Sequence, residues 1–248
     1  MPVPALAAAL ALAAVHLVAA RLRFLDGVPR SRWLSGAGGV SVAYVFVHLM
    51  PELAEGQAAA SAVQSGAFGL FEREIYLLAL AGLLTFYALE RLAKGANALD
   101  EGGPDGARGP GAEPSGAAFW VHLGSFAVYN MIVGYLLVHR EAPGPLSLAL
   151  FALAMALHFV VTDYGLRADY AQSWERIGRW ALVAAVLVGW GMGAALEVSE
   201  LAVAGATAFL GGGVILNVLK EELPEERKSR FSALLAGAIG YAALLLVV

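Results

Sequence analysis

The sequence predicts an all-α integral membrane protein with eight transmembrane helices, because of its composition and the spacing of its apolar runs. Of the 248 residues, 59% are hydrophobic and only 15% are charged, with a mean hydropathy of +0.70, which is too apolar for an ordinary soluble domain. Apolar runs of about 20 residues, the length that crosses a bilayer core of roughly 30 Å, recur along the chain. They cover residues 3–22, 34–54, 73–94, 117–139, 145–166, 178–197, 200–220 and 231–248.

The whole chain, residues 1–248, is predicted to form a single transmembrane domain. Its first run lacks the positively charged start of a signal peptide and is long enough to span, so we expect it to be the first transmembrane helix. The segment from Gly95 to Gly116 is rich in Gly, Pro, Ala and acidic residues, a composition that cannot bury a core. We expect it to be a disordered linker that separates three helices from five.

The distribution of Lys and Arg predicts the orientation in the membrane. The loops after the first, third, fifth and seventh runs hold 14 of the 16 basic residues, and only Arg73 and Arg140 fall in the other loops. Cytoplasmic loops carry the excess of basic residues. We therefore expect a multi-pass protein of the cell (inner) membrane, with a cytoplasmic linker and both termini outside.

Charge and cysteine content exclude several other classes of function. A net charge of -4 provides no basic surface for nucleic acid. The chain has no Cys, so it forms neither disulfides nor thiolate metal sites, and any metal ligands must be His, Asn or carboxylates.

The fourth and fifth runs hold most of the polar side chains expected at bilayer depth. Such groups are costly in a membrane, so they face a bundle interior, a cavity or each other. On the fourth run, His122, Ser125 and Tyr129 recur at i, i+3 and i+7 and so share one face, with Asn130 beside it. On the fifth run, His158 and Thr162 share a face, and Asp163 follows directly after Thr162.

The ends of the second and seventh runs suggest an internal repeat. The second reads GGVSVAYVFVHLMPE from Gly38, and the seventh reads GGGVILNVLKEELPE from Gly211. Counted from the proline, both have polar residues at minus seven, minus three and plus one: Tyr44, His48 and Glu52 in the second run, and Asn217, Glu221 and Glu225 in the seventh. The predicted orientation places Pro51 outside and Pro224 inside. Helices 1–3 and 6–8 would then be inverted copies, as in many transporters with a central site; the alternative is a chance similarity.

These features together resemble the ZIP family of divalent metal transporters. The resemblance is carried by the His48-Leu49-Met50-Pro51-Glu52 end of helix 2, the linker after helix 3, the eight spans with both termini outside, and the Leu216 to Glu225 end of helix 7. It implies a 3+2+3 bundle in which helices 4 and 5 form the path for a divalent cation of the zinc, iron or manganese class. It also implies that the protein often forms a homodimer.

The family's metal centre is only partly present. Helix 4 of the family typically carries His-Asn followed by an acid and Gly, where this chain has Tyr129, Asn130, Val133 and Gly134. Helix 5 typically carries His-Glu-x-Pro-His-Glu, and the residues here are His158, Phe159, Val160, Val161, Thr162 and Asp163. We therefore expect at most one weakly bound divalent ion and no organic cofactor. Its candidate ligands are His158, Asp163, Asn130 and His122.

Each candidate ligand also has a structural interpretation. His158 could simply be a buried imidazole bonded to Thr162 or to a helix carbonyl, and Asp163 could form an interfacial ion pair with Arg167. Asn130 could bridge two helices. His122 is predicted near the headgroups, where packing would explain it.

Further candidates lie along the expected path. His48 and Glu52 are one helical turn apart near the outer surface and could form its outer mouth, or could mark a loop boundary set by Pro51. Ser125, Tyr129, Thr162 and Glu221 are candidates for the path itself. We interpret His16 and His139 as structural residues.

Three functions remain open at this stage. The first is a ZIP-like carrier of a divalent cation, which is not an enzyme and whose partners are the lipid bilayer and the metal ion. The second is a membrane protein of the same fold that has lost metal transport and serves a structural or sensor role. The third, a minor alternative, is an intramembrane hydrolase that uses Ser125, His122, His158 and Asp163, although the zinc-protease spacing His-Glu-x-x-His is absent.

Overall fold

The computed structural model describes residues 3–19, 32–63, 74–101, 116–139, 144–222 and 230–246, without the side chains of 62–63, 93–101 and 221–222. Within these ranges the chain is helical and contains no strand. Six of the described helices are long and apolar enough to cross a membrane. The protein is therefore an all-α, multi-pass membrane protein, as the sequence predicts.

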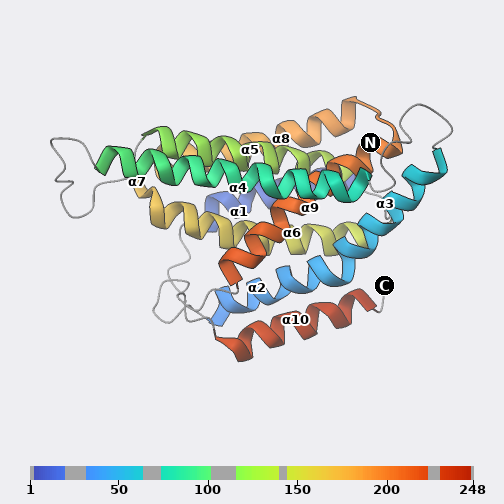
Figure 1. Ribbon diagram of the computed structural model, residues 1–248. Helices are drawn as coiled ribbons and strands as arrows, with labels where there is room; N and C mark the ends of the chain where they lie inside the picture. Colours follow the sequence, from blue (N-terminus) through green and yellow to red (C-terminus); the bar gives the residue numbers. More distant parts are fainter. Residues whose placement is uncertain are drawn as a thin grey trace.

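A helix lies on each of the eight predicted apolar runs (Figure 1). The helices are α1 (Val3–Val18), α2 (Arg32–Tyr44) continued by η3 (Val45–Leu49) and α3 (Met50–Val63), α4 (Glu74–Glu101), α5 (Gly116–His139), α6 (Pro145–Asp169), α7 (Ala171–Ser173) continued by η4 (Trp174–Gly178) and α8 (Arg179–Ala195), α9 (Glu200–Glu222) and α10 (Phe231–Leu246). The α1 and α10 helices have 16 residues each and are shorter than the other six spans.

The helix that begins with α2 does not stop near residue 54, and Pro51 is not a loop boundary. Helical structure continues through Pro51 to Val63. Proline lacks an N–H and its ring collides with the carbonyl four residues before it. The wide π-helical turn η3, in which the N–H of Met50 donates to the carbonyl of Val45, ends two residues before the proline. Such local π turns allow a membrane helix to accommodate proline.

Two other helix boundaries differ from the predicted ones. The α4 helix continues to Glu101, into the predicted linker, because Ala, Leu and Glu near its end favour a helix. The remainder of the linker, 102–115, lies outside the described residues. The sixth span begins at Ala171 rather than at 178, directly after a break at Tyr170. The ring of Trp174 in η4 is fully buried, which explains why this polar stretch joins the bundle.

Three helix pairs make up most of the bundle: α2 with α10, α4 with α9, and α5 with α8. In Figure 1, α2 and α10 lie side by side in the lower part, and α4, α5 and α8 lie in the upper part. In each pair, glycines allow the two backbones to approach closely, as is common in membranes. In the α5–α8 pair, a Cβ on Gly134 would collide with the carbonyl of Val186, and one on Gly189 with that of Met131.

The α2–α10 pair uses the same reciprocal arrangement. A Cβ on Gly39 would collide with the carbonyl of Leu234, and one on Gly237 would collide with the carbonyl of Gly36. Each helix therefore contributes a glycine to the point where the two backbones cross.

The α4–α9 pair repeats this contact with matching spacing. A Cβ on Gly212 would collide with the carbonyl of Ala79, and one on Gly82 with the carbonyl of Phe209. Phe209 and Gly212 of α9 lie 15 and 12 residues before Pro224 in the sequence. Gly36 and Gly39 of α2 lie 15 and 12 residues before Pro51. On the partner helices the carbonyl residue precedes the glycine by three positions in both cases.

The α1 helix packs against α6 and α8. The buried face of α1 consists mainly of Ala5, Ala8, Ala9, Leu12 and Ala13. Because these side chains are small, α1 approaches its neighbours closely. The last turn of α1 thereby carries a fully buried histidine, His16, to the centre of the molecule.

The close glycine contact between α2 and α10 predicts a strong difference between two glycines of α10. Gly237→Ala should lower the free energy of unfolding by about 1–3 kcal/mol, because the added methyl group would overlap the carbonyl of Gly36. Gly240→Ala is the matched control, since no atom lies within 4 Å of the position of its Cβ. Thermal unfolding in detergent measures both, and equal effects of the two substitutions would contradict the packing described here.

Candidate functional site

His16 joins three helices at the centre of the bundle. Its Nδ1 lies 2.8 Å from Oδ2 of Asp163 on α6, and its Nε2 lies 2.8 Å from Oδ1 of Asn130 on α5. The exposed fractions of the three residues are 0% for His16, 1% for Asp163 and 2% for Asn130. We call His16, Asn130 and Asp163 the buried polar cluster. Two of the four predicted metal ligands, Asn130 and Asp163, are thus joined by His16, which the sequence predicts to be a structural residue.

The orientation of the Asn130 amide fixes the direction of one of these hydrogen bonds. Its Nδ2 donates to the carbonyl of Phe126, one turn earlier on α5, at 2.8 Å. The amide oxygen therefore faces His16, and Nε2 of the imidazole must donate to it. The other bond, between His16 and Asp163, contains one shared proton. Whichever of the two atoms carries that proton, the pair is neutral as a whole, which reduces the cost of burying it.

Two polar atoms near the cluster have no hydrogen-bond partner. They are Oδ1 of Asp163 and Nε2 of His158, and both are buried. A buried polar atom without a partner costs roughly 1–3 kcal/mol, so each such atom requires an explanation, and a bound ion is one. Both atoms can bind a cation through a lone pair.

Aromatic rings lie next to both His158 and His16. The rings of Tyr129 and His158 are 5.4 Å apart, and that of Phe159 is 4.7 Å from His16 and 6.3 Å from Tyr129. Phe159 stands where the resemblance would place a glutamate. The hydroxyl of Thr162 donates to backbone carbonyls of α6, including that of His158, and does not bond the His158 ring.

The two remaining candidates on α5 lie apart from the cluster. Nδ1 of His122 is 2.9 Å from the hydroxyl of Tyr170, at the end where α6 terminates. The hydroxyl of Ser125 donates to the backbone carbonyl of His122 at 2.8 Å. The structure therefore pairs His122 with Tyr170, away from Asp163 and Asn130.

His48 and Glu52 form a second, half-buried pair around Pro51. Nε2 of His48 and Oε2 of Glu52 are 3.9 Å apart, and the ring of Tyr44 lies 5.3 Å from that of His48. Because Pro51 is inside a helix, both side chains stand on successive turns rather than at a loop. The side chain of Glu221, the predicted counterpart of His48 in the repeat, lies outside the described residues.

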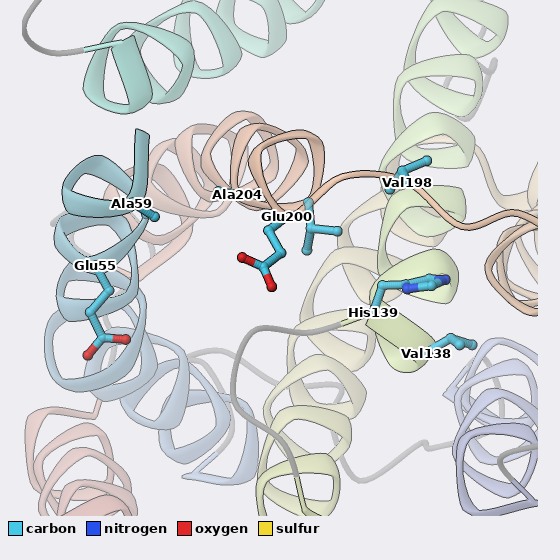
Figure 2. A pocket seen from close by; sticks show the side chains of 9 residues that line it. Glu55, Ala59, Val138, His139, Val198, Glu200 and Ala204 are labelled. Carbon is cyan, nitrogen blue, oxygen red and sulfur yellow. The ribbon is translucent and has the colours of Figure 1, made fainter. Parts of the chain in front are cut away.

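A cavity of about 480 Å³ opens near this pair (Figure 2). Its polar lining residues are Glu55 of α3, His139 of α5 and Glu200 of α9. In Figure 2 the Glu200 carboxylate lies between α3 and α5, whereas the His139 ring points away from it. This orientation agrees with the 2.7 Å hydrogen bond from Nε2 of His139 to the carbonyl of Gly193.

The described residues contain no group of three or more His, Asp or Glu arranged to hold a metal ion. Near the buried polar cluster, one imidazole nitrogen, Nε2 of His158, and one carboxylate oxygen, Oδ1 of Asp163, have no hydrogen-bond partner and could accept a cation. The other two oxygens of the cluster are already bonded to His16.

His16 is the residue that sequence reasoning missed. A detectable signal existed, since it is the one ionisable side chain in a helix otherwise made of apolar residues and Pro4. An ionisable residue inside a membrane helix is a functional candidate by default. Its partners are 114 and 147 residues away in sequence, so no local spacing identifies them.

The direct bond between His16 and Asp163 predicts a strong energetic coupling. His16→Ala and Asp163→Ala should each destabilise the protein, because each leaves a buried partner unpaired. The double variant should lose less than the sum, with a coupling energy of about 1–3 kcal/mol. A double-mutant cycle of unfolding free energies in detergent measures this quantity, and strictly additive losses would show that the two side chains do not interact.

Comparison with known proteins identifies no relative. No protein-family model, no curated protein and no solved structure matches the chain.

Proposed function

We propose that the chain is a ZIP-like membrane carrier that moves a divalent metal cation along a path between α5 and α6. The observation that carries this proposal is the pair of unpartnered buried atoms on α6, Nε2 of His158 and Oδ1 of Asp163. A neutral imidazole and a carboxylate suit zinc, iron or manganese. Water would complete the coordination of a single weakly held ion.

The proposed architecture has eight spans arranged as 3+2+3, with α1 and α10 crossing the bilayer as well. A helix of 16 residues is about 24 Å long, so these two require a locally thin bilayer or additional turns. In its favour, α1 packs against α6 and α8, and α10 pairs with α2. Figure 1 also marks both chain ends on the same side of the bundle, as an even number of spans requires.

The matched glycine contacts support the inverted repeat. If helices 1–3 correspond to helices 6–8, the contact of α2 with α10 must correspond to that of α9 with α4. The reciprocal glycines occur in both pairs at matching positions, counted from Pro51 in one and from Pro224 in the other. Pro224 itself lies outside the described residues. Repeats related in this way rock against a central pair of helices in many carriers.

The proposed orientation keeps both termini outside and the 95–116 linker in the cytoplasm of the cell, in the inner membrane. It rests on the basic residues of the alternate loops. In this orientation His48, Glu52 and the acidic cavity beside them face outward. They would form the outer mouth of the path, where carboxylates concentrate cations.

A second candidate is a protein of the same fold that no longer transports metal. The hydrogen bonds from His16 to Asn130 and Asp163 favour it, because they satisfy two oxygens that a cation would need. A hydrolase has less support, since the Ser125 hydroxyl donates to a backbone carbonyl rather than to an imidazole.

Transport by the purified protein separates these candidates. In proteoliposomes the wild-type chain should take up Mn²⁺ or Zn²⁺ above the level of empty vesicles, and His158→Ala should lose about tenfold or more of the rate, because it removes a buried imidazole nitrogen that has no hydrogen-bond partner. Tyr241→Phe is the control for loss of a buried polar group, since its hydroxyl donates to the backbone carbonyl of Leu150 and Tyr241 is none of the predicted path residues. Wild-type uptake no greater than that of empty vesicles would favour the second candidate.

A further inference from the structure

We propose that the end of the bundle where α6 leads into α8 binds an anionic phospholipid, whose headgroup phosphate is held by Arg176 and Arg179. The partner is a lipid of the surrounding bilayer. This inference is therefore independent of the carrier proposal and of the buried polar cluster, and it holds whether or not the chain moves a metal ion.

The position of the two arginines is the first support. They belong to a helical segment that begins directly after the break at Tyr170, and the fully buried Trp174 packs this segment into the bundle. Figure 1 shows α7 at the same end of the bundle as the start of α5 and the end of α6. The ends of membrane spans lie in the headgroup layer. Both arginines are thus placed at the level of the lipid phosphates.

The second support is that the protein leaves both guanidinium groups incompletely bonded. Nη1 of Arg179 donates to Oε2 of Glu175 at 2.8 Å, whereas Nε of Arg179 has no hydrogen-bond partner. Arg176 is exposed and forms no ion pair within the part of the chain that the structure describes. The two arginines are three residues apart, on neighbouring turns of one helix. Guanidinium groups donate paired N–H bonds to phosphate oxygens, so this arrangement suits a phosphate.

The third support is the aromatic surroundings. Trp180 is 53% exposed, and Cζ of Arg179 lies 5.4 Å from the centre of its ring. Trp120, near the start of α5, is 57% exposed. Exposed indoles of this kind lie at the boundary between the headgroups and the acyl chains. A lipid bound here would place its chains against the indoles and its phosphate beside the arginines, and basic sites between helices bind anionic headgroups in this way.

The test is native mass spectrometry of the purified full-length chain in detergent, titrated with phosphatidylglycerol and, separately, with phosphatidylcholine. The first phosphatidylglycerol should bind about tenfold more tightly than phosphatidylcholine. Arg176→Gln and Arg179→Gln should each weaken the binding of phosphatidylglycerol about fivefold, the effect of one basic residue near an anionic membrane surface. Glu175→Gln should strengthen it, because this half-exposed carboxylate competes with the phosphate for Nη1 of Arg179.

Arg32→Gln is the matched control. Arg32 is also exposed and is followed by an exposed tryptophan, Trp33, but it lies at the start of α2. It should leave the binding of phosphatidylglycerol unchanged. Equal binding of the two lipids by the wild type, or an equal loss in Arg32→Gln, would overturn the site. Displacement of the lipid by an equal concentration of glycerol phosphate would show a site for free phosphate and would overturn the assignment to a lipid.

Discussion

The hydrogen bonds from His16 to Asn130 and Asp163 are the interaction on which the polar centre of this protein depends. Without His16, a carboxylate and an amide oxygen would both be buried in an apolar bundle with no donor in reach. The imidazole satisfies both oxygens and keeps the Asp163 pair neutral. Since the three residues come from α1, α5 and α6, the same bonds also fix how these helices sit against one another. Because buried polar groups are tolerated only when they are bonded, these hydrogen bonds favour one specific arrangement of the three helices.

Around this centre, the three main helix pairs approach closely at small residues. Lipid is as apolar as leucine, so helices in a membrane associate through van der Waals contact at small residues. The reciprocal glycines of α2 with α10 and of α4 with α9 follow this rule, and their matched spacing supports related halves.

Hydropathy was sufficient to locate the helices, because crossing a bilayer requires a long apolar run whatever its partners are. Boundaries were less predictable. Pro51 was interpreted as a possible helix end, yet the wide turn η3 before it lets the helix continue, and nothing in the local sequence announces a π turn. The extension of α4 to Glu101 follows helix propensity in a stretch that composition alone assigns to a linker.

The candidate site was predictable only in part, since sequence reasoning identifies polar residues but not their distant partners. Asn130, His158 and Asp163 are indeed buried. The local interpretation of Asp163 pointed to Arg167, four residues away, because that spacing places two side chains on one helix face. The structure instead pairs Asp163 with His16, which is 147 residues distant. Only the packing of α1 beside α6 brings the two together.

The central claim concerns the two bonds of the His16 ring, and solid-state NMR of the protein in lipid bilayers tests it most directly. With labelled His, Asn and Asp, the ring nitrogens of His16 should show through-space correlations to the side-chain carboxyl carbon of Asp163 and the side-chain carbonyl carbon of Asn130, at separations that match hydrogen bonds. His16 signals without either correlation, or a correlation of Asp163 with Arg167 in its place, would contradict the account.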